Sequence, residues 1–193
     1  MNELHSQIEQ VFRLVDPEIW IVTAAAGQRR GGLVATWVTR ASLDANAPLV
    51  VAGLAPNHYT AELALAAGAF GLHLIARDQI QLAWRFAIGS GRERDKLAGL
   101  SLQPGRTSAP ILTDCLAWLE CRVVTTYNSG DRIFFWADVV AGEQIGPGNP
   151  VTEGELISAA SPEQLAALVE NRTADIELQR PLRLEWRNLI QTQ

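Results

Sequence analysis

The amino-acid sequence predicts a mainly β fold with helices, in which short strands form a closed or nearly closed β-barrel. Strand patterns recur at regular spacing along the chain, with short helical patterns between them. The strands do not alternate one for one with long helices, which argues against a Rossmann sheet. Neither a G-x-G-x-x-G motif nor a Walker-type phosphate loop occurs in the chain. The length fits one domain over residues 1–193, with the barrel at about 17–157 and a helical tail at about 161–190.

The first half of the chain predicts a helix, a hairpin and a strand that leads into a second helix. Apolar residues at helical spacing precede Asp16-Pro17, which ends the first helix. β-branched and aromatic residues flank the glycine-rich turn 27–32 and indicate a hairpin. Gly68 is a typical helix end. The expected elements are a helix at 3–15, strands at 19–23, 33–43 and 49–54, and a helix at 59–67.

The second half predicts a second hairpin and a C-terminal helix. Asn, Ser, Gly and Asp stand between two strand patterns and favour a tight connection. Ser161-Pro162 begins the last helix with proline at its first position, and Pro181 must kink or split that helix. The expected elements are a strand at 70–75, a helix at 79–88, strands at 116–125 and 133–140, and the helical tail.

Composition and charge limit the class of protein. Hydrophobic residues make up 48% of the chain, enough for a packed core, which excludes disordered, collagen-like and coiled-coil classes. The net charge of −5 is a poor start for binding a phosphate backbone, so we expect no nucleic acid partner. No apolar run could span a membrane, and the polar first residues lack the apolar block of a secretory signal. We expect a cytoplasmic protein with no membrane association and reduced thiols.

Metal and nucleophile chemistry find no support in the residues. Cys115 and Cys121 are too few for a disulfide framework, and we expect them in the core. The three histidines have no second ligand at metal-binding spacing, so no metal site is expected. His73, inside an apolar strand, is expected to be a core or interface residue. No G-x-S-x-G elbow is present, and no cysteine has a histidine close in sequence.

An anion site is indicated where residues 55–60 follow a strand and open a helix. Free N–H groups and the positive end of the helix dipole favour an anion at such a position. Asn57 or His58 lies near the cap, and Thr60 adds a hydroxyl. A plain helix cap is the alternative interpretation.

Two further polar clusters are candidates for ligand binding. Strand alternation would put Thr36, Arg40 and Ser42 on one face, opposite Trp37 and Thr39. That polar face suits a ligand with phosphate and ribityl hydroxyls, and a solvated strand face is the alternative. The other cluster, for which a solvated loop is the alternative, consists of Arg92, Arg94 and Lys96.

These segments resemble the flavin reductase-like family, the FMN-binding split barrels. The run GGLVATWVTRASLDANAPLVVAGLAPNHYTAEL carries the resemblance, together with GAFGLHL, GRERDKLAG and GDRIFF in the family's order. The match covers roughly residues 15–145. It implies a six-stranded split barrel that works as a homodimer, with FMN, or FAD as the alternative, in a groove near the dimer interface.

The resemblance also implies the residues of the flavin site. Those that would line the isoalloxazine, mostly through backbone groups, are Thr36, Trp37, Val38 and Thr39. Those that would hold the ribityl chain and the phosphate are Ser42, Ala55, Pro56, Asn57, His58 and Thr60. Lys96, with Arg92, would add positive charge at the phosphate.

Two departures from the family pattern concern the nicotinamide side of the site. Trp37 stands in a place where the family often has a small hydroxyl residue. Its indole could stack on the flavin or occupy the place of the nicotinamide. Arg132 replaces the histidine of a Gly-Asp-His motif and cannot donate a proton near neutral pH. Arg132 is the one candidate for a catalytic role, through the nicotinamide phosphates or the flavin, and a solvated turn residue is its alternative.

The resemblance implies an NAD(P)H-dependent flavin reductase. Hydride would pass from NADH or NADPH to the flavin, and then on to free flavin, oxygen or a partner oxygenase. The alternative is an FMN-holding electron carrier or sensor without nicotinamide turnover, which Trp37 and Arg132 favour. A third option, another planar anion such as heme or pyridoxal phosphate, is not favoured by the histidines or lysines.

Overall fold

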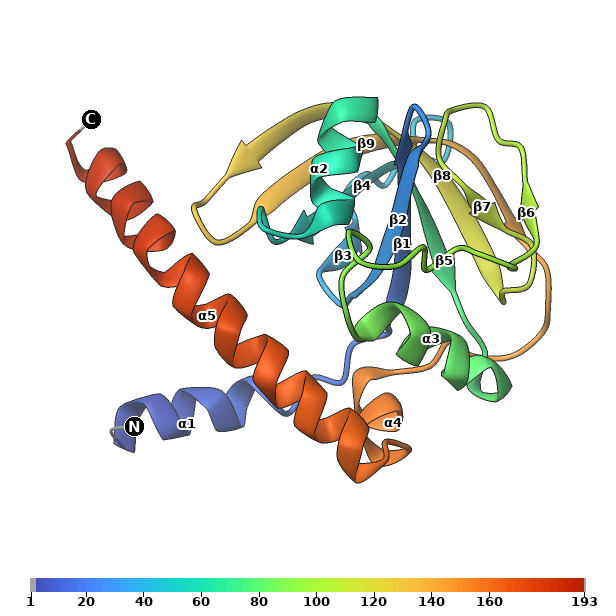
Figure 1. The fold of residues 1–193 in the computed structure, drawn as a ribbon. Coiled ribbons are helices and arrows are strands. Elements are labelled where there is room, and N and C mark those ends of the chain that lie inside the picture. The colour runs from blue at the N-terminus through green and yellow to red at the C-terminus, as the bar shows by residue number, and fades with distance from the viewer. Residues whose placement is uncertain (1–2, 193) are drawn as a thin grey trace.

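The computed structural model describes residues 3–192 and contains a curled antiparallel sheet with helices around it (Figure 1). The main sheet has seven strands in the order β2-β1-β5-β8-β9-β4-β3, and a second sheet pairs β6 with β7. The strands are β1 (Trp20–Ala26), β2 (Arg29–Ala35), β3 (Val38–Arg40), β4 (Leu49–Leu54), β5 (Ala69–Leu74), β6 (Leu102–Gln103), β7 (Ile111–Leu112), β8 (Ala117–Asn128) and β9 (Ile133–Gln144). The helices are α1 (Glu3–Phe12), α2 (Tyr59–Ala67), the 3-10 turn η1 (Arg77–Gln79), α3 (Ile80–Ala87), α4 (Glu153–Ser158) and α5 (Pro162–Gln191).

The main sheet curls because its two edge strands are neighbours in the chain. Only Thr36 and Trp37 separate β2 from β3, yet β2 and β3 lie at opposite ends of the strand order. So short a link requires the two edges to approach each other, which is the geometry of a split barrel. The carbonyl of Trp37 accepts a hydrogen bond from the N–H of Gly53 in β4, at 2.7 Å. We call this join between the two edges the seam.

The expectation of six strands is wrong, because the predicted strand at 33–43 is two strands. β2 pairs with β1, whereas β3 pairs with β4 at the other edge of the sheet. The hairpin turn is also tighter than expected, since β2 already begins at Arg29 and Gly27 supplies the turn with φ of 63°. The expected bounds of β4 and α2 are confirmed, and Gly68 ends α2 in the left-handed conformation.

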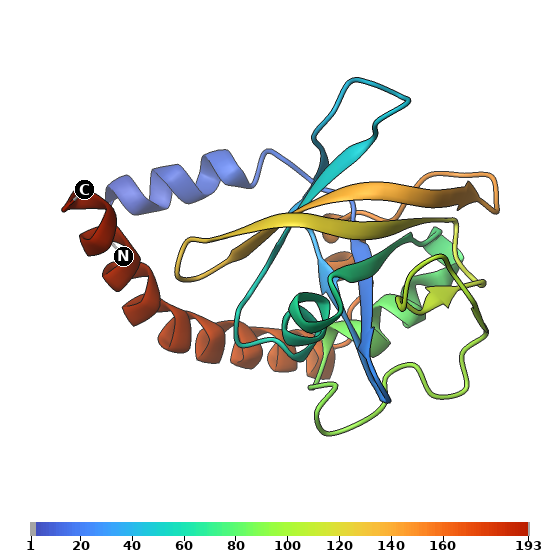
Figure 2. The same ribbon diagram turned by 90° about the horizontal axis from the view of Figure 1, so that it is seen from above.

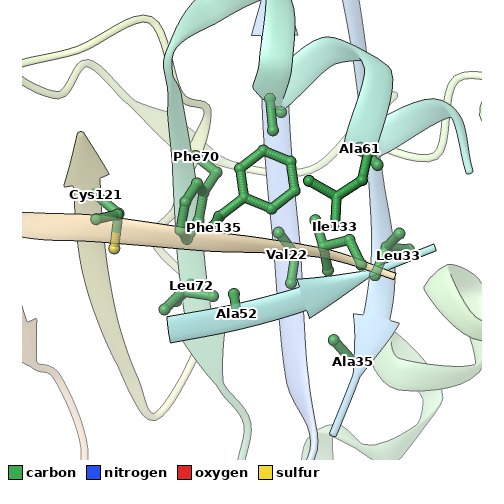
Figure 3. Packing of buried hydrophobic residues seen from close by; sticks show 14 of the residues in the cluster. Val22, Leu33, Ala35, Ala52, Ala61, Phe70, Leu72, Cys121, Ile133 and Phe135 are labelled. Atoms are coloured by element: carbon green, nitrogen blue, oxygen red, sulfur yellow. The ribbon is translucent and has the colours of Figure 1, made fainter. Parts of the chain in front are cut away.

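The core consists of two clusters of buried side chains. The first fills the inside of the curl, where Phe70 and Phe135 meet edge to face with ring centres 5.9 Å apart (Figure 3). The second lies between the sheet and α3, and includes Trp84 and Phe86. Gly32 permits this packing, because a Cβ atom there would lie 2.5 Å from the Phe86 ring.

The expected core positions of His73, Cys115 and Cys121 are confirmed. His73 is fully buried, its Nδ1 lies 3.0 Å from the carbonyl of Ile21, and its Nε2 accepts the N–H of Leu112 at 3.0 Å. Because Nε2 accepts a bond, the ring proton lies on Nδ1. Both cysteines are buried and free, and burial raises the pKa of the Cys115 thiol to about 11. These three residues are structural rather than reactive.

The C-terminal helix α5 runs along one side of the barrel and past the strands (Figures 1 and 2). Ser161 caps its start, and the Ser161–Gln164 capping box satisfies two terminal N–H groups. Pro181 was expected to kink or split this helix, and the split does not occur, because one helix continues through Pro181. Of its thirty residues only Gln179 is buried, and its apolar side chains are largely exposed. No helix within residues 3–192 is long and apolar enough to cross a bilayer.

Candidate functional site

A pocket lies at the seam where the two edges of the sheet approach each other. Its volume is about 110 Å³. The residues that line it come from the end of β2, the seam link, the end of β4, the start of α2 and the β8–β9 turn: Leu33, Val34, Ala35, Thr36, Trp37, Gly53, Leu54, Ala55, His58 and Arg132. The curl of the sheet therefore brings together segments about a hundred residues apart in the sequence.

One wall of the pocket is an aromatic stack with a cation over it. Trp37 is 51% exposed and stacks on Phe134 with an interplanar angle of 10°. Gly53 leaves room for the two stacked rings, because a Cβ atom at this position would crowd them, at 3.1 Å from Phe134 and 3.2 Å from Trp37. The guanidinium of Arg132 lies 4.6 Å from the centre of the Trp37 ring, a cation–π contact.

The same Arg132 is held from two sides by hydrogen bonds. Its NH1 donates to the carbonyl of Asp131 and to Oε1 of Gln179 in α5, both at 2.6 Å. Burial lowers the pKa of Arg132, whereas the charges of Asp131 and Asp175 raise it. An arginine remains protonated under these conditions, so the pocket has a permanent positive charge on one wall.

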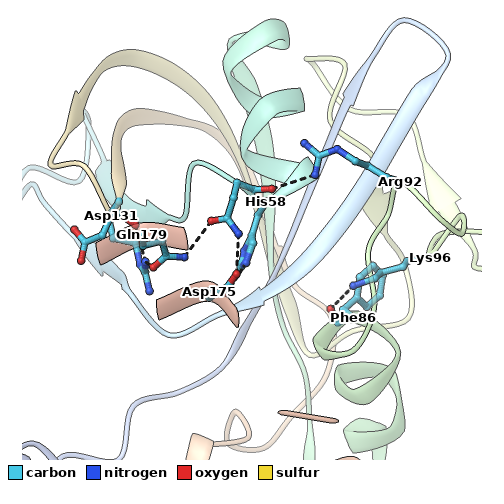
Figure 4. A network of polar contacts seen from close by, with 9 residues as sticks. His58, Phe86, Arg92, Lys96, Asp131, Asp175 and Gln179 are labelled. Carbon is cyan, nitrogen blue, oxygen red and sulfur yellow. Dashed lines mark hydrogen bonds and ion pairs between the residues drawn. The ribbon is translucent and has the colours of Figure 1, made fainter. Parts of the chain in front are cut away.

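The start of α2 forms the other side of the site and is covered by α5 (Figure 4). His58 is the N-cap of α2 with extended backbone, and its side chain makes no capping bond. Nε2 of His58 instead binds Oδ2 of Asp175 at 2.8 Å, and Nδ2 of Asn57 donates to Oδ1 of Asp175 at 2.7 Å. Gln179, one turn further along α5, donates to Oδ1 of Asn57 at 3.0 Å. An internal carboxylate is therefore bound beside this helix start by the side chains of Asn57 and His58.

Asp175 and Gln179 were not among the site residues predicted from the sequence. A polar pair spaced by four residues on a long helix is ordinary for a solvated face. Their contacts with Asn57 and His58 span 117 to 122 residues, a distance over which no local pattern carries information. The only indication available was the helical spacing, which puts both side chains on the same face.

Some expected site residues do not reach the pocket. Arg40 donates to the carbonyls of Ser42 and Leu43, and the hydroxyl of Ser42 accepts the N–H of Asp44 at 3.1 Å. These side chains support the turn after β3 instead. Val38 and Thr39 lie in β3 and pair with β4, outside the residues that line the pocket. The expected alternation over 36–42 fails because β3 contains only residues 38–40.

At the start of α2, the expected residues divide between the pocket and its surroundings. Ala55 lines the pocket, whereas Pro56 does not and Thr60 is buried in the first turn of the helix. Arg92 donates to the carbonyl of Asn57 at 3.1 Å and to Glu62 at 3.0 Å. It also lies 5.2 Å from the centre of the Tyr59 ring. Arg92 is thus close to the start of α2 but already has an acidic partner.

Lys96 is not at the pocket. Its Nζ donates to the carbonyl of Phe86 at 2.7 Å, and Figure 4 shows this pair apart from the Asp175 network. The side chain is buried, and burial, with a smaller effect of the Arg94 charge, lowers the pKa of Lys96 to about 8. Its observed contact satisfies a carbonyl at the end of α3.

The chemistry of the pocket fits a planar aromatic ligand with an anionic tail. Trp37 offers an aromatic face, Arg132 a fixed cation, and Asn57 and His58 donors at a helix start. A volume of about 110 Å³ is small beside the roughly 300–1,000 Å³ of ordinary ligand pockets. In this conformation the pocket can therefore enclose only part of such a ligand.

The model of a known protein family matches most of the chain. Residues 12–153 match the family model described as the flavin reductase like domain. The chain is 28% identical over 147 residues to diflavin flavoprotein A 1 of Synechocystis sp., covering 74% of this chain and 25% of that protein. It is 30% identical over 136 residues to the high molecular weight rubredoxin of Moorella thermoacetica, covering 69% of this chain and 58% of that protein. The chain thus spans about a quarter of the diflavin flavoprotein's length.

Solved structures share the same fold. The FMN-binding protein of Thermus thermophilus, in a structure with bound 1-cyclohex-2-enone, matches with a TM-score of 0.62 and 27% identity. The match covers 68% of this chain and 72% of that one. The curled sheet described above is therefore a split barrel of the kind found in FMN-binding proteins.

Proposed function

Because the chain belongs to the flavin reductase-like family, we propose that it binds FMN at the seam pocket and catalyses hydride transfer from NADH or NADPH to the flavin. FAD is the alternative flavin. The observation that carries this proposal is the convergence of Trp37, Arg132 and the start of α2 on one pocket. An aromatic wall, a cation and helix-end donors are the groups that recognise a flavin and its phosphate.

The residues divide into those for the ring and those for the tail. Thr36 and Trp37, with the backbone of Val38 and Thr39, are proposed to hold the ring. Ala55, Asn57 and His58 are proposed to bind the ribityl chain and the phosphate, together with Ser42, Pro56, Thr60 and Arg92 as the family resemblance implies. Lys96 is left out of this proposal, because its ammonium group binds the carbonyl of Phe86. When bound, the flavin supplies the hydride-accepting chemistry, and the protein supplies position and charge.

Arg132 is proposed to act by charge and position, not as an acid. A guanidinium does not lose its proton near neutral pH, so it cannot serve as a general acid or base there. Its contact with Trp37 fixes the orientation of the indole, and its bond to Gln179 ties the pocket wall to α5. Arg132 therefore supplies a fixed positive charge to a ligand in the pocket.

We further propose that two copies of the chain pair to complete the site. Apolar side chains are exposed along both terminal helices, among them Val11 and Phe12 in α1 and Val169 and Leu178 in α5. Exposed apolar surface of this kind is typical of an interface. The small volume of the pocket in one chain supports the same proposal, because a second subunit can add walls. The electron acceptor is proposed to be free flavin, oxygen or a partner oxygenase.

An FMN-holding carrier or sensor is the second candidate. Trp37 and Arg132 favour it, because the family resemblance puts both residues on the nicotinamide side of the site, where the Arg132 guanidinium lies over Trp37 and binds Gln179. In that case the flavin would be reduced by another donor.

A visible spectrum tests both candidates. FMN is titrated into the purified protein, followed by NADH and then NADPH without oxygen. Binding followed by rapid loss of the oxidised-flavin absorbance supports the reductase, and binding without bleaching supports the carrier. If the protein binds neither FMN nor FAD, both proposals fail.

A further inference from the structure

This inference rests on the proposed flavin site and concerns the choice between flavins. We propose that Asp175 of α5 is a specificity-determining residue, whose carboxylate holds the anion position at the start of α2 against the phosphate of FMN. Its chemical consequence is that FMN binds only when Asp175 leaves this position, a cost in affinity that riboflavin, which has no phosphate, does not incur.

The Asp175 carboxylate is bound as a ligand anion would be. Each of its oxygens has its own donor, Nδ2 of Asn57 at 2.7 Å and Nε2 of His58 at 2.8 Å. Both donors stand at the start of α2, where the helix dipole favours negative charge. A phosphate needs the same donors, and two anions at one helix start repel each other. Phosphate and Asp175 therefore compete for this position.

Gln179 fixes Asp175 in this place. It is 6% exposed, although the rest of α5 is half-buried or exposed. Its amide donates to Asn57 and accepts from Arg132, so it joins the two walls of the pocket. Gln179 lies one turn after Asp175 on the same face of α5. Its two hydrogen bonds therefore set the rotation of the helix that points Asp175 at His58.

The arginines at this end of α2 already have acidic partners before any ligand binds. Arg92, which donates to the carbonyl of Asn57, is paired with Glu62 at 3.0 Å, and Arg29 shares Glu62 at 2.7 Å. Arg132 has the charges of Asp131 and Asp175 near it, which raise its pKa against the effect of burial. A phosphate would thus meet arginines that already have acidic partners, and it would lie beside the negative charge of Asp175 unless Asp175 leaves.

The test compares affinities for FMN and riboflavin in the full-length protein. Asp175→Asn removes the charge and keeps the shape, so folding is preserved. We expect it to tighten FMN binding by about tenfold or more, while riboflavin affinity changes by less than about threefold. Glu177→Gln is the matched control, because it removes the same negative charge from an exposed position on the same helix. It should change neither affinity.

Each result has a distinct meaning. If Asp175→Asn binds both flavins and keeps the wild-type ratio of affinities, the inference is overturned and the proposed function stands. If no variant binds either flavin, the proposed function fails and the inference fails with it. Hydrogen exchange gives a second readout, since FMN, but not riboflavin, should speed exchange of the amides around Asp175 in the wild type. Equal exchange with the two flavins would also overturn the inference.

Discussion

The guanidinium of Arg132 lies over the face of Trp37, 4.6 Å from the centre of its ring. Trp37 belongs to the two-residue link between β2 and β3, and Arg132 lies in the turn between β8 and β9. The contact therefore joins the seam of the barrel to the tip of its longest hairpin.

The Arg132–Trp37 contact should appear as a coupling energy. We expect a double-mutant cycle with Arg132→Met and Trp37→Leu, measured by urea unfolding, to give about 0.5–1 kcal/mol, because a half-exposed cation–π pair is partly solvated. Arg40→Met serves as the control partner for Trp37→Leu, since Arg40 binds the carbonyls of Ser42 and Leu43. If the coupling energy between Trp37 and Arg132 is no larger than that between Trp37 and Arg40, the cation–π contact does not contribute to stability.

His73 should make the protein less stable in acid. Burial lowers the pKa of His73 from 6.5 to about 4 in the folded state. Between these values the unfolded chain binds more protons, so the free energy of unfolding falls as the pH drops from about 6.5 to 4, by roughly 3 kcal/mol. Protonation of Nε2 would also break its bond from the N–H of Leu112.

His73→Gln separates this effect from other titrations. Glutamine does not titrate, so urea unfolding at several pH values should show a smaller acid-dependent loss for the variant than for the wild type. Parallel pH curves for the two proteins would contradict the assignment.

Arg92 and Lys96 should differ in their effects on flavin choice. Arg92 contacts the start of α2, whereas Lys96 is buried against the carbonyl of Phe86. Titration calorimetry with FMN and riboflavin should show that Arg92→Met weakens FMN binding more than riboflavin binding, by about three- to tenfold. Lys96→Met should leave the ratio of the two affinities unchanged. A selective loss of FMN binding in Lys96→Met would instead restore Lys96 to the phosphate site.

Gly130 should control how closely α5 lies on the β8–β9 hairpin. It has φ of 87°, and a Cβ there would collide with the backbone carbonyl of Leu182. Gly130→Ala should therefore push α5 away and break the 3.1 Å bond from Trp186 to Tyr127, which faster hydrogen exchange in the second half of α5 would report.

Gly27→Ala is the matched control for this effect. Gly27 lies in the other hairpin turn with φ of 63° and has no atom within 4 Å of a built Cβ. Gly27→Ala should lower the free energy of unfolding by about 1–2 kcal/mol, because alanine disfavours the left-handed backbone, and it should not change hydrogen exchange in α5. Equal exchange in the two variants would show that Gly130 does not hold the helix.

Local signals in the sequence were enough for elements with clear ends. α2 ends at Gly68 and β4 follows Pro48, and both were predicted with the bounds that the structure has. Ser161 and Pro162 likewise indicate where α5 begins. Turn and capping residues act through their immediate neighbours, so a single sequence contains this information.

The remaining features depend on contacts between distant parts of the chain. Thr36 and Trp37 have good strand propensity, so nothing local indicates that the chain leaves one edge of the sheet there and joins the other. The burial of Lys96 depends on the end of α3, ten residues earlier, whose carbonyl needs a donor. Asp175 meets Asn57 across 118 residues. Tertiary packing decides each of these features.

The chain enters and leaves the barrel at the same place. Glu18 and Thr152 form an isolated bridge, and the N–H of Glu153 donates to the carbonyl of Pro17 at 2.9 Å. The segment that matches the family, residues 12–153, ends beside this point. A unit whose two ends meet can be joined into a longer polypeptide at a single junction without stretching its strands. The bridge thus gives the barrel the geometry of a domain that can be inserted into a longer chain. In diflavin flavoprotein A 1 the matching segment is one quarter of the protein.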